Sequence, residues 1–202
     1  GGFFGATVCD SLQDVLAAHG QADAFGIDVP LGMPESGPRA ADAAARLALG
    51  PRRATIFMTP PRAVLEAPTY AEARARATEL TGKSISAQSF ALRHNVLEAD
   101  ELRGDPRVFE VHPELAFRAM AGGVLLTGKR SWNGASERRD LLAEAGLELP
   151  SALGSAGAVP VDDVLDAAAA AWSARRIARG EAGRVPDAPG LDEHGRPVAI
   201  WF

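Results

Sequence analysis

The pattern of hydrophobic and polar positions predicts a short buried strand at residues 25–29, followed directly by a loop. Phe25, Gly26, Ile27 and Val29 form an apolar run, which is typical of a strand in a sheet covered on both faces. Asp28 interrupts the run, and prolines and glycines from residue 30 onward take the chain out of the sheet. Ligands of open α/β sheets bind at the carboxyl ends of strands, so Asp28 is a candidate site residue. The alternative is that Asp28 caps the loop by accepting backbone hydrogen bonds.

Helical patterns dominate the next part of the chain, about residues 36–104. Three helices are predicted there, over residues 38–49, 70–82 and 86–102, and the second begins with a capping box from Thr69 to Glu72. Residues 1–9 read as a strand, and Ser11 is expected to cap a short helix after it. No linker sets residues 36–104 apart, which predicts a helical insertion within a single domain spanning residues 1–202.

A second strand is predicted at residues 107–112, where Pro113 ends it. Val108, Glu110 and His112 share one face of this strand. A long helical connection is what a parallel crossover requires, so the two strands are expected to be parallel neighbours. A short helix over residues 114–120, a loop over 122–135, a helix over 136–145 beginning near Ser136, and a final strand over 197–202 complete the pattern.

The strongest helical pattern covers residues 161–179. Its middle, Ala167 to Ala171, is narrow enough to pack closely across the two strands. Asp162 and Asp163 lie in the first turn, where the helix dipole favours negative charge, and the alternative is that they are only caps. Asp163 and Asp166 are three residues apart and share a face. A carboxylate among alanines needs a partner or an ion.

If this helix packs beside the first strand, the carboxylates of Asp28, Asp163 and Asp166 converge. Clustered carboxylates repel one another unless a cation lies between them. Oxygen ligands suit Mg²⁺ or Mn²⁺, so one of these ions is the expected cofactor. Sites of this type promote phosphoryl or phosphodiester chemistry.

Three arginines after the Asp28 loop, Arg39, Arg52 and Arg53, are candidate substrate-binding residues, because arginine binds phosphate bidentately. Arg39, Asp42 and Arg46 also lie along one helix face. The alternative for this face is a solvated stripe of ion pairs.

Composition narrows the class of protein. The chain has 202 residues, 47% of them hydrophobic and 23% charged, as in an ordinary globular domain. No apolar run reaches the ~18 residues of a membrane span, so no membrane contact is expected. Cys9 is the single cysteine, which fits a reducing, cytoplasmic location. The net charge of −5 gives no overall attraction to nucleic acid, and the only lysines are Lys83 and Lys129.

Four stretches carry a resemblance to a known family: GIDVPLGMP from residue 26, RAADAAARLALGPRRATIF from residue 39, EVHPE from residue 110 and DDVLDAAAAAW from residue 162. In order and spacing they resemble domain-of-unknown-function family 429, from about Phe25 to the C-terminus, and the final PVAIWF resembles that family's ending. The family is described as predicted nucleases. The resemblance implies an α/β fold, an RNase H-like mixed sheet with helices on both faces and a helical insertion between strands.

The same resemblance implies roles for individual residues. RNase H-like enzymes carry acids on the first and fourth strands and at i, i+3 on the last helix. Asp28 matches the fourth-strand acid, and Asp163 and Asp166 match the last-helix pair, which makes all three metal ligands. Glu110 and His112 match the family's fifth-strand motif and complete the implied catalytic set, with His112 a candidate proton shuttle. The alternative for His112 is a strand-end histidine bonded to backbone.

One departure from the family pattern concerns the first strand. Members usually open with a glycine-flanked Asp, and no residue before Asp10 matches it, so the strands that open the fold are missing or atypical here. With one carboxylate fewer, these residues alone are expected to hold Mg²⁺ weakly and to show little turnover.

The leading hypothesis is a metal-dependent nuclease or related phosphodiester hydrolase, with nucleic acid as its partner. The first alternative is a non-catalytic nucleic-acid or nucleotide binder, or a scaffold, of the same fold. A kinase-like phosphotransferase is a further alternative, but the sequence shows no glycine-rich phosphate loop to support it.

Overall fold

A small sheet of short strands lies at the centre of the molecule, in a computed structural model that describes residues 2–192 and 194–202. Strands β1 (Phe25–Ile27) and β2 (Val108–Glu110) are parallel neighbours, with Phe25 opposite Val108 and Ile27 opposite Glu110. The prediction of two adjacent parallel strands is therefore confirmed. The chain thus has an α/β fold, in which a long helical connection joins two parallel strands.

A second two-stranded sheet lies beside the first. Strands β3 (Arg184–Val185) and β4 (Ile200–Trp201) are antiparallel, and β4 confirms the predicted final strand. A parallel bridge between Val111 and Trp201 connects this pair to the end of β2. The four strands together therefore mix parallel and antiparallel neighbours.

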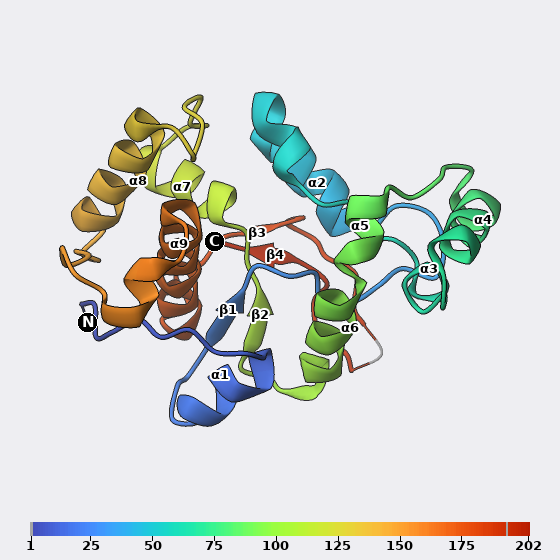
Figure 1. The fold of residues 1–202 in the computed structure, drawn as a ribbon, viewed down its shortest axis with the longest axis horizontal. Coiled ribbons are helices and arrows are strands. Elements are labelled where there is room, and N and C mark those ends of the chain that lie inside the picture. The colour runs from blue at the N-terminus through green and yellow to red at the C-terminus, as the bar shows by residue number, and fades with distance from the viewer. Residues whose placement is uncertain (1, 193) are drawn as a thin grey trace.

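Helices cover both faces of the β1–β2 pair (Figure 1). On one face, Phe25, Ile27 and Val108 are buried against α1 (Leu12–Ala18) and α6 (Arg93–Glu101). On the other face lies α9 (Val161–Ala178), which comes so close to β1 that a Cβ on Gly26 would stand 2.6 Å from the carbonyl oxygen of Ala170. Only glycine fits that contact. The predicted packing of the 161–179 helix across the strands is confirmed.

Helix α9 also forms the core of a three-helix layer. Helices α7 (Pro113–Ala121) and α8 (Trp132–Glu144) pack on it through buried apolar residues that include Phe117, Leu142, Leu165 and Trp172. The short helix η3 (Gly154–Ala158) leads into α9. This layer fixes the direction of α9 and therefore of its acidic side chains.

The segment between β1 and β2 is helical, as predicted. It contains α2 (Ala40–Leu49), η1 (Gly50–Thr55), α3 (Arg62–Leu65), α4 (Tyr70–Thr81), α5 (Ala87–Ala91), α6 and η2 (Leu102–Gly104). Helices α3 to α6 share a hydrophobic cluster of their own, with Val64, Leu65, Phe90 and Val96 among its members. The predicted helix over residues 86–102 is interrupted at Leu92, where α5 ends and α6 begins.

Three local predictions about element boundaries have clear outcomes. Ser11 and Thr69 cap their helices, and each side-chain oxygen accepts a hydrogen bond from a backbone N–H three residues later. The predicted strand at residues 1–9 is wrong for the described residues 2–9, because no neighbouring strand supplies the ladder that a strand needs. Helix α8 begins at Trp132 with Ser131 as its cap, and not near Ser136.

Candidate functional site

The candidate site lies where β1 and β2 end. Asp28 directly follows β1, Glu110 is the last residue of β2, and His112 precedes α7. The loop between α7 and α8 brings Lys129 to the same region, and α9 contributes Asp166. Four elements and one loop thus place titratable side chains at the carboxyl ends of two parallel strands, where α/β sheets bind their ligands.

Asp28 has an unusual environment. Its side chain keeps contact with solvent, yet the surrounding protein raises the pKa of its carboxyl to about 8. Desolvation is the largest cause, and the negative charges of Asp166 and Glu110 add to it, while Lys129 opposes it. The carboxyl accepts no hydrogen bond from the described residues. The alternative in which Asp28 caps the loop is therefore wrong.

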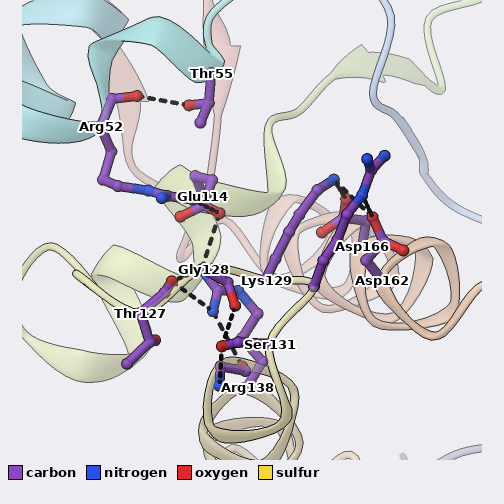
Figure 2. A network of polar contacts seen from close by, with 12 residues as sticks. Arg52, Thr55, Glu114, Thr127, Gly128, Lys129, Ser131, Arg138, Asp162 and Asp166 are labelled. Atoms are coloured by element: carbon purple, nitrogen blue, oxygen red, sulfur yellow. Dashed lines mark hydrogen bonds and ion pairs between the residues drawn. The ribbon is translucent and has the colours of Figure 1, made fainter.

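Lys129 bridges two acids of α9 (Figure 2). Its Nζ lies 2.5 Å from Oδ2 of Asp166 and 3.7 Å from Oδ2 of Asp162. Burial would lower the pKa of Lys129, but the hydrogen bond to Asp166 and the charges of Asp166, Asp162 and Asp28 raise it overall. Asp166 has the partner that its alanine-rich surroundings required, and that partner is an amine of the chain itself.

The acid that joins Asp166 is Asp162, and not Asp163 as the sequence suggested. Asp162 is buried, with 4% of its surface exposed, and also accepts a hydrogen bond of 3.0 Å from Nε of Arg130. Asp163 is exposed and lines a cavity of about 810 Å³ between α9 and the N-terminal segment. The acid paired with Asp166 through Lys129 is Asp162 rather than Asp163, because the packing of α9 buries Asp162 beside Lys129 and leaves Asp163 exposed.

Arg39 and Glu110 form a buried ion pair. Arg39 is 5% exposed, and its Nη1 and Nη2 donate to the two carboxylate oxygens of Glu110 at 2.6 and 2.5 Å. The same guanidinium donates to Asp42, which is 0% exposed, and to the carbonyl oxygen of Leu31. The expectation of a solvated stripe is wrong for Arg39 and Asp42. With its donors occupied inside the protein, Arg39 does not present them to an incoming phosphate.

This ion pair also holds the loop that follows Asp28. Oε2 of Glu110 accepts a hydrogen bond of 2.8 Å from the backbone N–H of Leu31, three residues after Asp28. Glu110 and Arg39 therefore act on the site by fixing this loop, and the sequence alone did not indicate that role.

His112 is neutral at physiological pH. Desolvation is the main reason why the pKa of His112 falls to about 4, and the charge of Lys129 lowers it further. The hydrogen bond to the carbonyl oxygen of Thr55 and the charge of Glu114 raise the pKa, but by less. The Nε2 atom lies 3.4 Å from that carbonyl oxygen, whereas Nδ1 is buried without a hydrogen-bond partner in the described chain. If Nε2 carries the proton and donates a hydrogen bond to the carbonyl oxygen of Thr55, Nδ1 remains a hydrogen-bond acceptor. The alternative in which His112 is bonded to backbone therefore holds for Nε2 and does not hold for Nδ1.

Glu114 anchors an arginine network beside these residues (Figure 2). Its Oε1 accepts hydrogen bonds from Nη2 of Arg138 at 2.9 Å and from Nη2 of Arg52 at 3.0 Å. Arg138 is fully buried, whereas the Arg52 side chain keeps 22% of its surface exposed. The network therefore holds Arg52 at the surface of the site. The neighbouring Arg53 is exposed and makes no ion pair with the described residues.

The arrangement offers few ligands to a metal ion. Among the described residues, no group of three or more His, Cys, Asp or Glu side chains could hold a metal ion. Burial and the charge of Asp166 disfavour the ionised form of Asp28, and Asp28 has no hydrogen-bonding partner in the described chain, so a cation bound there would replace its proton and stabilise the carboxylate. Mg²⁺ commonly binds one or two carboxylates and completes its shell with water and substrate phosphate. The two acids fit that mode, and they do not fit a complete protein cage.

Sequence reasoning missed Asp162, Glu114, Arg138 and Lys129. Their side chains meet through contacts between distant segments, such as the 37 residues that separate Lys129 from Asp166. The scarcity of lysine was a usable signal, because Lys129 is one of two lysines in a chain that otherwise uses arginine.

Comparisons with known proteins place the chain in a family without assigning it an activity. No curated protein and no solved structure matches it. In the part of the chain that the structure describes, no helix is long and apolar enough to span a membrane. One family model, described as "Protein of unknown function (DUF429)", matches residues 1–190. The chain therefore belongs to the DUF429 family.

Proposed function

We propose that this protein is a metal-dependent phosphodiester hydrolase of nuclease type, and that its fold is RNase H-like. The observation that carries the proposal is Asp28: an acid at the carboxyl end of β1, open to solvent, free of hydrogen bonds from the described residues, and facing further negative charge from Asp166. A carboxyl that keeps its proton because it has no cationic partner, at the position where α/β sheets bind ligands, would ionise when it binds a cation, and this favours a cation-assisted reaction.

The topology supports the RNase H-like assignment. In the RNase H-like enzymes that the sequence resembles, an acid ends one central strand and another acid lies on the last long helix, which crosses that strand. Here Asp28 ends β1, and α9 carries Asp166 across the same strand at the close contact of Gly26. The parallel β1–β2 pair and the helical insertion between its strands agree with the same scheme.

A bound Mg²⁺ or Mn²⁺ would supply a Lewis acid that activates water and stabilises the leaving oxygen of a phosphodiester. Asp28 and Asp166 would hold that ion. Nδ1 of His112 can accept a hydrogen bond from a water molecule, because the ring is neutral at physiological pH. Arg53 offers an exposed guanidinium group that can bind the substrate phosphate, and Arg52, whose Nη2 is held by Glu114, is 22% exposed beside it.

A second candidate function is a non-catalytic binder of nucleic acid or nucleotides. Lys129 favours it, because its ammonium already neutralises Asp162 and Asp166, which a two-metal enzyme would use for its ions. A binder of this kind would use Arg52, Arg53 and Lys129 toward phosphate, and would need no divalent cation.

Hydrolysis assays separate the two functions. We expect slow cleavage of single-stranded, double-stranded or branched oligonucleotides with Mn²⁺ or Mg²⁺, lost with EDTA and lost in Asp28→Asn. The control variant Asp163→Asn changes an exposed first-turn acid and should retain the rate. Binding of these oligonucleotides without any metal-dependent cleavage, and with equal affinity in the Asp28→Asn variant, would favour the binder.

A further inference from the structure

Lys129 interacts with four of the side chains that make up the candidate site. It is bonded to Asp166 and lies within ion-pair distance of Asp162, and its charge also acts on Asp28 and His112. No other basic side chain in the described structure pairs with Asp166. The position of this one ammonium therefore controls the charge balance of the site.

The loop that carries Lys129 is fixed on both sides. The carbonyl oxygen of Gly128 accepts hydrogen bonds from the backbone N–H of Ser131 at 2.9 Å and from its Oγ at 2.7 Å. Two nitrogens of the buried Arg138 side chain donate to the carbonyl oxygen of Thr127 at 3.4 Å (Figure 2). A Cβ on Gly134 would stand 2.0 Å from the Gly128 oxygen, so α8 packs directly against this turn. The backbone on either side of Lys129 is thus held in place before any ligand arrives.

The type of residue matters as well. An ammonium is a compact point charge on a flexible stem, whereas a guanidinium is a wide planar fork. The chain has 21 Lys and Arg residues, and only Lys83 and Lys129 are lysines. At Lys129, Nζ reaches carboxylates on successive turns of α9, which is how a small cation would be placed between two acids.

We propose that Lys129 is the built-in counter-cation of this site: its ammonium takes the cation position between Asp162 and Asp166, and leaves room for a single divalent ion at Asp28. This inference rests on the proposed function for the presence of that ion. Because Oδ2 of Asp166 is already bonded to Lys129, a divalent ion that uses Asp166 has to share it with the ammonium. Lys129 therefore weakens divalent-cation binding and restricts the site to one ion.

The charge argument sets the direction of the effect. A positive charge a few ångströms from a binding position opposes a second cation, and removing it raises the affinity for that cation. The interaction is reduced by solvent, since the Lys129 side chain is 33% exposed. We expect an increase in Mn²⁺ affinity of roughly tenfold when the charge is removed.

Calorimetric titration of Mn²⁺ into the whole chain tests the proposal. Lys129→Met should bind Mn²⁺ roughly tenfold more tightly than the unmodified protein, and Lys129→Gln should do the same if the Met variant folds poorly. Lys129→Arg keeps the positive charge and should therefore bind Mn²⁺ more weakly than Lys129→Met does, although its wide guanidinium fork fits less closely between the two acids than the ammonium. Arg130→Met removes the neighbouring, 85% exposed cation and should have a much smaller effect.

The outcomes separate this inference from the proposed function. Equal or weaker Mn²⁺ binding in Lys129→Met and Lys129→Gln would overturn the inference, and metal-dependent cleavage by the unmodified protein would still stand. Tighter Mn²⁺ binding in these variants, with no cleavage by any form, would support the counter-cation and contradict the hydrolase. No Mn²⁺ binding by any form would overturn both.

Discussion

Asp28 keeps its proton at neutral pH, because its pKa of about 8 lies far above the 3.8 of an ordinary aspartate. Around it, the other acids of the site have cationic partners: Lys129 for Asp166, and Arg39 for Glu110. A carboxyl without such a partner, beside other acids, is held in its neutral form. At the scale of single residues, the site is therefore defined by Asp28, an acid for which the described residues provide no ion-pair partner.

The raised pKa of Asp28 predicts how stability depends on pH. Between about pH 4 and pH 8 the native state binds a proton that the unfolded state has lost, so Asp28 makes the free energy of unfolding fall as pH rises through this range. Asp28→Asn should remove this dependence and stabilise the protein at pH 8–9 by on the order of 1 kcal/mol, a value reduced by the solvent contact of the side chain. Urea unfolding at pH 5, 7 and 9 measures the effect.

An unchanged slope of stability with pH in Asp28→Asn would contradict the raised pKa. The matched control is Asp163→Asn, which changes an exposed acid on α9 and should leave both the slope and the stability nearly unaltered.

Some residue positions were predictable from the sequence and others were not. Asp28 was, because a single acid ended an apolar run just before a Pro/Gly loop. The choice between Asp162 and Asp163 was not, since both occupy the first turn and only the packing of α9 decides which one is buried. The burial of Arg39 was equally hidden, because its partner Glu110 is 71 residues away. Local patterns describe single elements, and these contacts join distant ones.

At the scale of elements, the contact between α9 and β1 positions the two acids of the site. Gly26 and Ala170 meet where the helix crosses the strand, and Asp28 follows two residues later. The sequence predicted this crossing from the narrow alanine-rich middle of the helix. It did not predict the loop conformation at residues 122–131, which places Lys129, because that loop shows no hydrophobic periodicity from which to predict it.

Gly26→Ala tests the crossing. The added Cβ would lie 2.6 Å from the Ala170 carbonyl oxygen, so α9 and β1 must move apart. We expect a loss of about 1–3 kcal/mol in the free energy of unfolding, as is typical of overpacked contacts. Thermal or urea unfolding measures it. The control is Gly104→Ala, where a Cβ would meet no atom within 4 Å, and a similar loss in both variants would show that the contact is not specific.

At the scale of the whole molecule, the small sheet separates distinct apolar clusters. One joins α7, α8 and α9, and another lies within α3 to α6, on opposite sides of the strands in Figure 1. The candidate site lies at the ends of the strands, between elements that belong to different clusters. The α/β class and the helical insertion followed from the sequence, because strand-like runs and capped helices are local signals. The clusters did not, since they depend on how helices pack.

The central claim is that Asp28 holds a divalent cation. Titration of Mn²⁺ into the unmodified protein and into Asp28→Asn, followed by calorimetry at pH 8.5 where the Asp28 carboxyl is largely ionised, tests it most directly. We predict one weakly bound ion in the unmodified protein, at least tenfold weaker binding in Asp28→Asn because a charged ligand is lost, and unchanged binding in Asp163→Asn. Equal Mn²⁺ affinity in the unmodified protein and in Asp28→Asn would contradict the claim.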